Sequence, residues 1–231
     1  MKICIIVPAL NEAATIGKLV QAIKAKNYDV VVIDDGSSDD SGKIAKDLGA
    51  VVIRNAHKSG KGASLQKGFD YALKGDYTGI ITMDSDGQHD PEDLSVFIDE
   101  ARKDPNCVIT GNRMAQAKGM PWVRFKTNQF MSFLISKACH QKIPDTQCGY
   151  RYIGADVLRL IRFRLKSRDF EIETEILMKA VKQGFKVSSV PVKTIYRDEK
   201  SKISPFKDTM RFFVYFIKEL REPKDWQVNG Q

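Results

Sequence analysis

The sequence is poor in cysteine and lacks any long apolar run. Its four cysteines, Cys4, Cys107, Cys139 and Cys148, form no CxxC pair, which leaves zinc-binding and redox motifs unsupported. No stretch approaches the roughly 18–20 apolar residues that cross a bilayer. The apolar N-terminal run is too short for a signal peptide and stops at Pro8. We therefore expect reduced thiols and a cytoplasmic protein without a transmembrane segment.

Composition excludes disordered and fibrous proteins, because 42% of the 231 residues are hydrophobic and 29% are charged. The net charge of +8 is unevenly distributed. Residues 1–115 carry 14 Lys/Arg and 17 Asp/Glu, whereas residues 116–231 carry 23 and 12. A basic half attracts polyanions such as nucleic acid, an anionic membrane or phosphorylated substrates, and composition does not choose among them.

Strand and helix patterns alternate through the first half of the chain, which indicates a parallel sheet flanked by helices. Strands are expected at Ile3–Val7, Val30–Ile33, Ala50–Ile53 and Gly79–Met83, and helices at Asn11–Ala25, Ser41–Leu48 and Gly62–Leu73. In such sheets ligands bind beyond the carboxyl ends of the strands. Those ends carry acidic and turn residues here, at Pro8–Glu12, Asp34–Asp39 and Asp84–Asp86.

The second half has a looser pattern and no internal repeat or long linker. Its expected elements are helices at Pro91–Lys103, Trp122–Cys139, Glu171–Gly184 and Phe206–Leu220, and extended segments at Val108–Thr110, Gly149–Ile153 and Lys186–Val192. We expect a single domain over residues 1–231. Its parts would be residues 1–115, residues 116–205, and an amphipathic helix and tail over 206–231.

The triplet Asp84-Ser85-Asp86 is the strongest chemical signal taken alone. Side chains at i and i+2 face the same side of an extended chain, and two carboxylates suit Mg²⁺ or Mn²⁺ bridging a diphosphate. An exposed acidic turn is the plain alternative. The spacing also resembles a haloacid dehalogenase loop, although Gln88 follows the Gly where that loop has Thr or Val, and Gly87 is misplaced for an EF-hand.

Two other segments carry weaker signals. The turn Asp34–Asp39 can accept hydrogen bonds from a ribose or a base, although it also suits a helix N-cap. The loop Lys58–Ala63 is glycine-rich and basic, so it can lie against phosphates or be a solvated loop. It matches neither a P-loop nor a GxGxxG motif.

Several motifs occur together in one order. They are Val7–Glu12, Val32–Asp39, Gly60–Ala63, Met83–Pro91, Gly111–Arg113, Asp145–Arg151, Glu173–Glu175, and Tyr196-Arg197 with Ser201–Ile203. This order resembles the family 2 glycosyltransferases with a GT-A fold, in particular the branch of dolichyl-phosphate mannose synthase. The resemblance runs from about residue 3 to residue 205. It implies an α/β fold with a mostly parallel central sheet flanked by helices, in which residues 1–115 form the nucleotide-sugar and metal-binding half and residues 116–205 the acceptor half.

The resemblance also implies roles for individual residues. Pro8, Leu10 and Glu12 match the segment that cradles the nucleotide, with Leu10 in place of the usual Tyr. Ile33 and Asp35 match the pair that binds base and ribose, and Ser85 lies beside the diphosphate.

The catalytic and metal positions come from the same resemblance. Asp84, Asp86 and Gln88 match a site for Mg²⁺ or Mn²⁺. Arg113, Arg197 and Lys202 match basic residues that hold the diphosphate and the acceptor phosphate. Glu175 matches an acidic position behind the sugar pocket. The implied catalytic set is Asp84, Asp86, Arg113, Glu175 and Arg197.

The implied activity is transfer of a sugar with inversion from a GDP- or UDP-sugar to a polyprenyl phosphate at the membrane surface. Arg151 is a further candidate for placing that phosphate. A saccharide acceptor in cell-envelope polysaccharide synthesis is the alternative, and Asp145 would then be the general base. A non-catalytic nucleotide-sugar binder is a third hypothesis. No nucleic-acid-binding signature accompanies the basic half.

The C-terminal segment bears on membrane binding. On the helix Phe206–Leu220, apolar residues fall on one face and Lys207, Arg211, Lys218 and Arg221 on the other. This face either packs on the core or docks on the inner face of the membrane. We also expect Arg197–Ser204 to form a lid over a bound diphosphate. The sequence does not identify the sugar, the base or the oligomeric state.

Overall fold

The computed structural model describes residues 1–117, 119–195 and 205–221. Seven strands form one sheet in the order β3-β2-β1-β4-β6-β5-β7. Their bounds are β1 Ile3–Ala9, β2 Asp29–Asp34, β3 Val51–Arg54, β4 Gly79–Thr82, β5 Val108–Asn112, β6 Arg151–Gly154 and β7 Val187–Pro191. Only β6 is antiparallel to its neighbours, β4 and β5. The predicted mostly parallel sheet is therefore confirmed.

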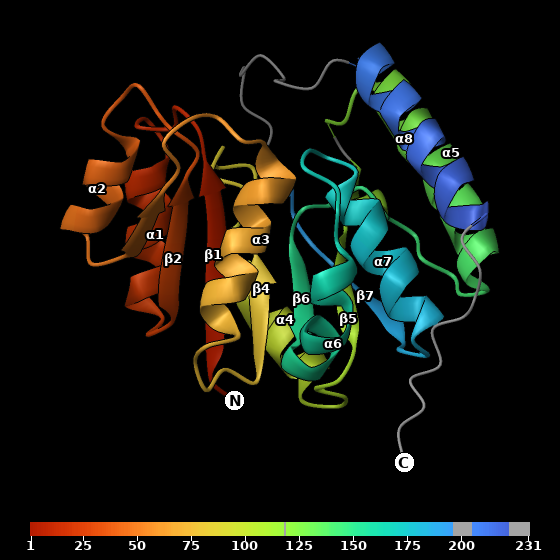
Figure 1. Ribbon diagram of the computed structural model, residues 1–231, viewed down its shortest axis with the longest axis horizontal. Coiled ribbons are helices and arrows are strands. Elements are labelled where there is room, and N and C mark those ends of the chain that lie inside the picture. Colours follow the sequence, from red (N-terminus) through yellow and green to blue (C-terminus); the bar gives the residue numbers. More distant parts are fainter. Residues whose placement is uncertain (118, 196–204, 222–231) are drawn as a thin grey trace.

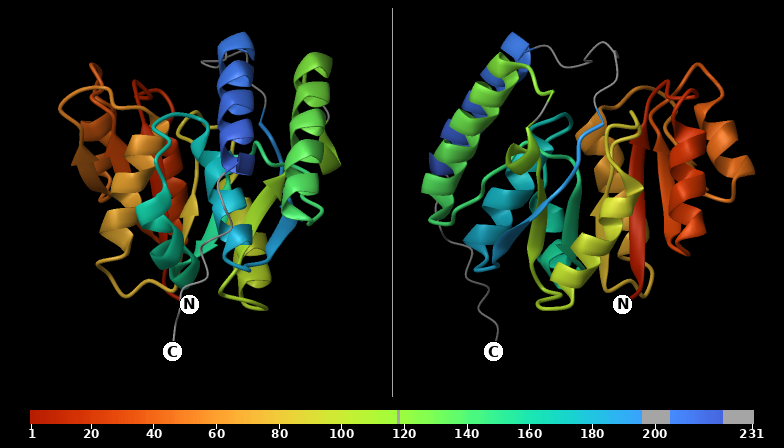
Figure 2. Two further views of the ribbon diagram at one scale, coloured as in Figure 1. Left: turned by 45° about the vertical axis from the view of Figure 1, so that its right-hand side comes forward. Right: turned by 180° about the vertical axis from the view of Figure 1, so that it is seen from behind.

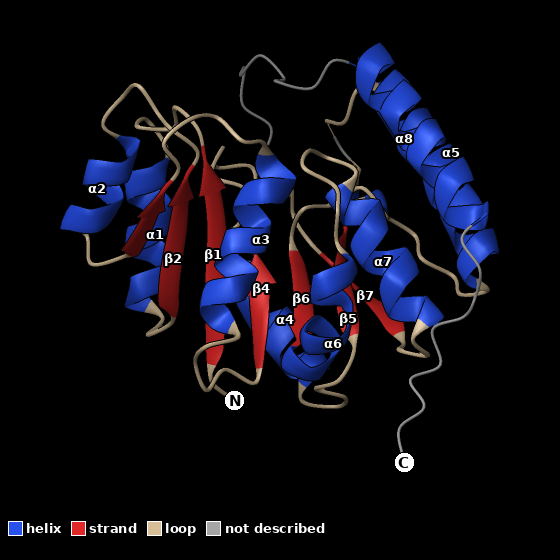
Figure 3. Ribbon diagram, in the orientation of Figure 1, coloured by secondary structure: helices blue, strands red, loops and turns tan. Residues whose placement is uncertain are grey.

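Helices cover both faces of the sheet (Figures 1 and 3). Their bounds are α1 Ile16–Ala25, α2 Ser41–Asp47, α3 Lys61–Ala72, α4 Leu94–Ala101, α5 Trp122–Cys139, α6 Ala155–Ile161, α7 Ile172–Lys182 and α8 Pro205–Arg221. Helices α3, α6 and α7 share one core with α5 and α8. Helices α1, α2 and α4 contribute to the core on the opposite face. Helix α6 has no counterpart among the helices expected from the sequence.

The first helix begins later than its apolar pattern suggests. Residues 11–15 form a turn, because Asn11 has a φ of 56°, and the Asn11 Oδ1 accepts a hydrogen bond from the Ser38 N–H at 2.8 Å. The Glu12 N–H donates to Ser41 Oγ at 2.7 Å. These bonds tie the end of β1 to the loop after β2, so α1 starts at Ile16 and turns Ile16, Leu19, Val20 and Ile23 into the core.

Helices α5 and α8 form a pair at the β7 end of the sheet, as the ring contact between Phe130 and Phe213 shows, with centroids 6.4 Å apart. The pair projects beyond the sheet at the edge where β1 and β2 end (Figures 1 and 2). The inner face of α8 buries Phe212 and Phe216. Among the helices of the described residues, none is long and apolar enough to cross a bilayer.

Candidate active site

The loops that follow β1, β2 and β4 meet at one edge of the sheet, since these three strands are parallel and adjacent. The Asp35 N–H donates to the Ala9 carbonyl at 2.8 Å, and Thr15 Oγ1 donates to the Ser85 carbonyl at 2.7 Å. These contacts join the three loops that the sequence assigned to a nucleotide-sugar. Thr15 itself carries no motif signal, so its role was missed.

Asp84 lies at the centre of this edge, beside a lysine. The Lys61 Nζ is 2.5 Å from Asp84 Oδ1 and 2.7 Å from Glu173 Oε1. Burial by itself would raise the pKa of Asp84, but the charges of Lys61 and Arg113 and the hydrogen bond from Lys61 hold it at about 2. Asp84 is therefore an anion in the folded protein, with its charge balanced mainly by Lys61.

Asp86 lies in a turn beyond β4, so the strand alternation invoked from the sequence does not apply here. Its Oδ1 accepts the Gln88 N–H at 2.9 Å. Burial and the nearby charge of Asp84 raise the pKa of Asp86. His89 is buried against the ring of Tyr150, and its Nδ1 accepts the Asp84 N–H at 3.2 Å. Burial lowers the pKa of His89, which favours the neutral imidazole.

These residues fit a divalent cation whose remaining ligands would come from a diphosphate. Burial and, after it, the nearby charge of Asp84 raise the pKa of Asp86, and a bound cation would offset both by favouring the carboxylate form. Among the described residues, no three His, Cys, Asp or Glu side chains form a metal-binding group. Mg²⁺ is often held by one or two carboxylates together with substrate phosphates. Asp84, Asp86 and the amide of Gln88 would be the protein's share.

The residues predicted to bind the nucleotide have different environments. Pro8, Leu10 and Glu12 are partly exposed at the end of β1, and the Glu12 carboxylate accepts the Thr15 hydroxyl at 3.2 Å. Ser85 is buried. The Ile33 side chain is fully buried in the core that includes Leu65 of α3. A base contact from the Ile33 side chain therefore does not fit the structure.

The acidic turn after β2 is held by its own neighbours. Asp35 accepts hydrogen bonds from the N–H groups of Ser59 and Gly60, at 2.8 and 2.9 Å, and from the Asn55 amide at 2.6 Å. Asp34 Oδ2 is 2.7 Å from Arg54 Nη1. Asp35 is only 4% exposed. Its carboxylate fixes the 55–60 loop, which is a structural role that the sequence did not reveal.

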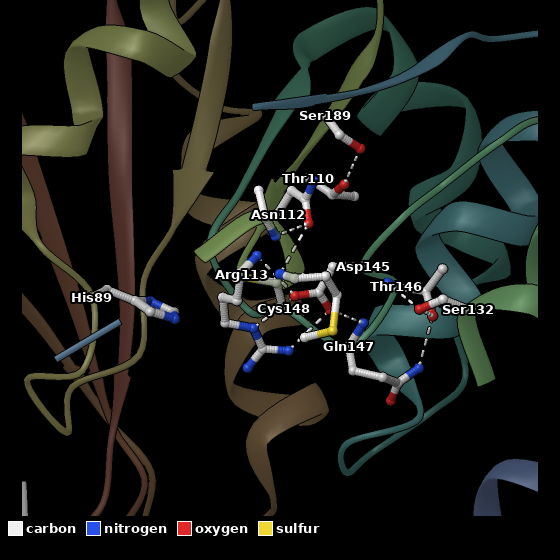
Figure 4. A network of polar contacts seen from close by, with 12 residues as sticks. His89, Thr110, Asn112, Arg113, Ser132, Asp145, Thr146, Gln147, Cys148 and Ser189 are labelled. Carbon is white, nitrogen blue, oxygen red and sulfur yellow. Dashed lines mark hydrogen bonds and ion pairs between the residues drawn. The ribbon is translucent and has the colours of Figure 1, made fainter. Parts of the chain in front are cut away.

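Arg113 is paired with Asp145 at the end of β5 (Figure 4). The Arg113 Nε and Nη2 donate to the two Asp145 oxygens at 2.8 and 3.0 Å, and both residues are buried. The charge of Arg113 also lowers the pKa of Asp84, so it lies within electrostatic reach of the acidic site. Asp145 is engaged in a bidentate ion pair, which does not suit the general base expected for an alcohol acceptor.

Arg151 has a structural environment. Its guanidinium donates to the carbonyls of Cys148 at 2.7 Å, Thr146 at 2.6 Å and Glu173. The residue is 1% exposed. The sequence suggested that Arg151 places the acceptor phosphate, and the structure corrects this, because all three guanidinium nitrogens donate to backbone carbonyls and the side chain is buried.

Glu175, expected behind the sugar pocket, binds backbone groups of a neighbouring loop. Its carboxylate accepts the N–H groups of Lys166 and Ser167 at 2.8–3.0 Å, and its Oε1 is 3.7 Å from Lys179 Nζ. It therefore fixes the 166–167 loop. The neighbouring acidic residue Glu173 is the one that reaches Lys61. Glu173 and Glu175 are two positions apart on α7, yet Glu173 faces the site and Glu175 supports a loop.

The glycines of the loop Lys58–Ala63 pack against the 167–169 loop. A Cβ at Gly60 would lie 2.4 Å from the Arg168 carbonyl oxygen, and one at Gly62 would lie 2.5 Å from that of Ser167. Both glycines thus permit close packing of the 167–169 loop on the start of α3. Lys61, between them, enters the site. Arg197 and Lys202, with the proposed lid over 197–204, lie outside the described residues.

The sequence of this chain is similar to those of known proteins. A family model for glycosyl transferase family 2 matches residues 4–162. The chain is 28% identical over 217 residues to a UDP-N-acetylglucosamine–dolichyl-phosphate N-acetylglucosaminyltransferase of Methanococcus voltae, covering 85% of this chain and 86% of the relative. It is 29% identical over 204 residues to the polyprenol monophosphomannose synthase of Mycolicibacterium smegmatis, covering 81% and 75%.

A solved structure resembles the fold closely. Glucosyl-3-phosphoglycerate synthase from Mycobacterium tuberculosis, crystallised with Mn²⁺, UDP and glucosyl-3-phosphoglycerate, has a TM-score of 0.74 and 16% identity, and the match covers 96% of this chain and 81% of that one. At this identity the similarity shows the fold, which is GT-A. The family match covers more than half of the sequence. This chain belongs to glycosyl transferase family 2.

Proposed function

We propose that this chain is a metal-dependent, inverting glycosyltransferase that moves a sugar from a GDP- or UDP-sugar to a polyprenyl phosphate. The observation that carries the proposal is the position of Asp84 and Asp86 at the carboxyl edge of the sheet, between the nucleotide-side loops and the cations Lys61 and Arg113. The named activities of the relatives from Methanococcus voltae and Mycolicibacterium smegmatis support the choice of acceptor.

The chemistry is a single displacement. An oxygen of the acceptor phosphate forms a bond to the anomeric carbon as the bond from that carbon to the donor diphosphate breaks, and the nucleoside diphosphate leaves. A bound Mg²⁺ or Mn²⁺ would neutralise charge on the leaving diphosphate. Asp84, Asp86 and Gln88 would hold that cation. Arg113 adds fixed positive potential near the same place. We also assign Arg197 and Lys202 to the phosphates, on the sequence resemblance.

A phosphate acceptor is favoured over an alcohol by the state of Asp145. An alcohol must lose a proton as it attacks and needs a general base near the anomeric carbon. A phosphate is already an anion and needs none. The candidate base Asp145 is buried and bound to Arg113 through both oxygens. A saccharide acceptor would therefore require a different base.

The lipid end of the acceptor has a candidate surface on α5 and α8. Large apolar side chains are exposed along both helices, namely Trp122, Val123, Phe130 and Phe133 on α5 and Met210, Val214, Ile217 and Leu220 on α8. So many exposed large apolar side chains on two adjacent helices favour a docking surface, because large exposed apolar patches on soluble monomers usually bind something. The pair projects at the edge of the sheet that carries the site (Figure 2). We propose that it rests on the membrane in which the acceptor is anchored.

The test is transfer of radiolabelled sugar to polyprenyl phosphate from a panel of GDP- and UDP-sugars, with and without EDTA. Asp86→Ala should retain the fold and lose transfer, because the cation would lose a carboxylate ligand. Asp99→Ala, which removes an exposed carboxylate on α4, is the matched control. Undiminished turnover in Asp86→Ala or in EDTA would contradict the metal dependence. Transfer to a saccharide with none to polyprenyl phosphate would favour the alternative acceptor.

A further inference from the structure

The ammonium of Lys61 contacts two carboxylates that belong to different parts of the fold. Asp84 follows β4, and Glu173 lies in the first turn of α7. The Nζ is 2.5 Å from Asp84 Oδ1 and 2.7 Å from Glu173 Oε1. The Asp84 side chain is 28% exposed and the Glu173 side chain 8%. The lysine therefore bridges an accessible acid and a buried one.

The surroundings keep the ammonium at this place. A Cβ at Gly149 would lie 2.9 Å from Lys61 Nζ and 2.5 Å from Asp84 Oδ2, so only glycine leaves room for the pair. The Gly149 carbonyl accepts the Thr82 hydroxyl at 2.7 Å, which fixes this wall to β4. The ring of Phe170 lies 5.6 Å from the Nζ on another side. The ammonium has little room to move except between its two partners.

Glu173 has unused capacity to accept hydrogen bonds. Its second oxygen, Oε2, is buried and has no hydrogen-bond partner among the described residues. Burying a carboxylate oxygen without a hydrogen-bond donor costs free energy, and native structures contain few such oxygens. A lysine ammonium carries three donors. If the ammonium leaves Asp84, a donor becomes available for Glu173 Oε2.

We propose that Lys61 is the resident counter-cation of the donor site and that it passes from Asp84 to Glu173 when a divalent cation binds Asp84. This inference rests on the metal-dependent transfer proposed above. In the metal-free protein the lysine balances the charge of Asp84 and keeps the loop after β4 in place. When the cation arrives, Glu173 retains the displaced ammonium, so the positive charge stays in the site without competing for Asp84.

Two substitutions should change Mn²⁺ affinity in opposite directions. Lys61→Met removes the charge that competes for Asp84, 2.5 Å from its Oδ1, and should tighten Mn²⁺ binding by about tenfold. Glu173→Gln deprives Lys61 of its second partner, keeps the ammonium on Asp84, and should weaken binding by a similar factor. Lys182→Met is the matched control, since Lys182, at the far end of α7, has a comparable exposure of 16% and a buried partner, Glu219 of α8. It should leave Mn²⁺ affinity unchanged.

The double variant separates exchange from a simple change in net charge. If Glu173 acts by receiving Lys61, Glu173→Gln should weaken Mn²⁺ binding at least about threefold more when Lys61 is present than in the Lys61→Met background. Equal effects in both backgrounds, or a larger one without the lysine, would overturn the exchange. Unchanged or weaker binding in Lys61→Met would overturn it as well.

The measurement is free Mn²⁺ by electron paramagnetic resonance, titrated into the protein alone and with UDP or GDP. Circular dichroism of each variant verifies the fold, and Glu173→Gln keeps the comparison possible if Lys61→Met does not fold. A wild-type protein that binds no Mn²⁺ under any of these conditions would overturn the metal dependence itself. A wild-type protein that binds Mn²⁺ while its variants fail the pattern above would overturn the exchange alone.

Discussion

Replacing Arg151 with methionine separates a structural arginine from one that binds the acceptor. The guanidinium donates to three buried carbonyls, those of Cys148, Thr146 and Glu173. Each hydrogen bond from a charged group is worth about 1.5 kcal/mol or more, so the loss is roughly 4–5 kcal/mol. Removing a buried charge offsets part of it. We expect a net loss of about 3 kcal/mol in the free energy of unfolding.

This loss is large beside the total stability of about 5–15 kcal/mol that is usual for a domain. For a chain of this length it corresponds to a fall in Tm of about 10 °C. The assay is urea unfolding followed by circular dichroism, with transfer kinetics measured well below the midpoint. Because Arg151 lies beneath the surface, the KM for polyprenyl phosphate should stay close to the wild-type value.

The control is Arg159→Met, which removes an exposed i,i+3 pair with Asp156 and should change stability by less than about 1 kcal/mol. An Arg151→Met protein with wild-type stability and a raised KM for the acceptor phosphate would refute the reasoning. Such a result would support the acceptor-binding role that the sequence suggested for Arg151.

Three further predictions concern other parts of the molecule. Asp145→Asn should destabilise the protein near neutral pH and progressively less below about pH 4. Burial would raise the pKa of Asp145, but Arg113 and its hydrogen bonds lower it overall. The wild-type ion pair therefore stabilises the fold above about pH 4, and this stabilisation is lost on acidification. A difference in the free energy of urea unfolding between wild type and Asp145→Asn that is the same at neutral pH and below about pH 4 would contradict this. Val214→Asp, on the exposed face of α8, should reduce co-sedimentation with anionic liposomes, while Lys43→Asp on α2 should have less effect; equal binding by wild type and Val214→Asp would exclude α8 as the anchor. Gly149→Ala should weaken Mn²⁺ binding, because its Cβ would lie 2.5 Å from Asp84 Oδ2 and displace the carboxylate proposed to hold the cation; unchanged affinity would contradict this.

Much of the fold could be predicted from local patterns. Buried strands such as Ile3–Ala9 are short β-branched runs, and amphipathic helices such as Ile16–Ala25 repeat apolar residues at helical spacing. Both signals depend on neighbours along the chain. The late start of α1 could not be predicted in this way, because it depends on Ser38 and Ser41, which contact residues 11 and 12 only after β1 and β2 pair.

The strand and turn patterns were enough to predict that Asp34–Asp39 and Asp84–Asp86 lie at one edge of a parallel sheet. Which charged residues face that edge depends on tertiary contacts that no local pattern contains. Arg151 and Glu175 carry the same charges as Arg113 and Glu173, yet the first two bind backbone groups. A charged side chain takes its role from the partners that burial leaves it, and those partners come from distant segments: Lys61 from α3, Asp84 from β4's loop and Glu173 from α7.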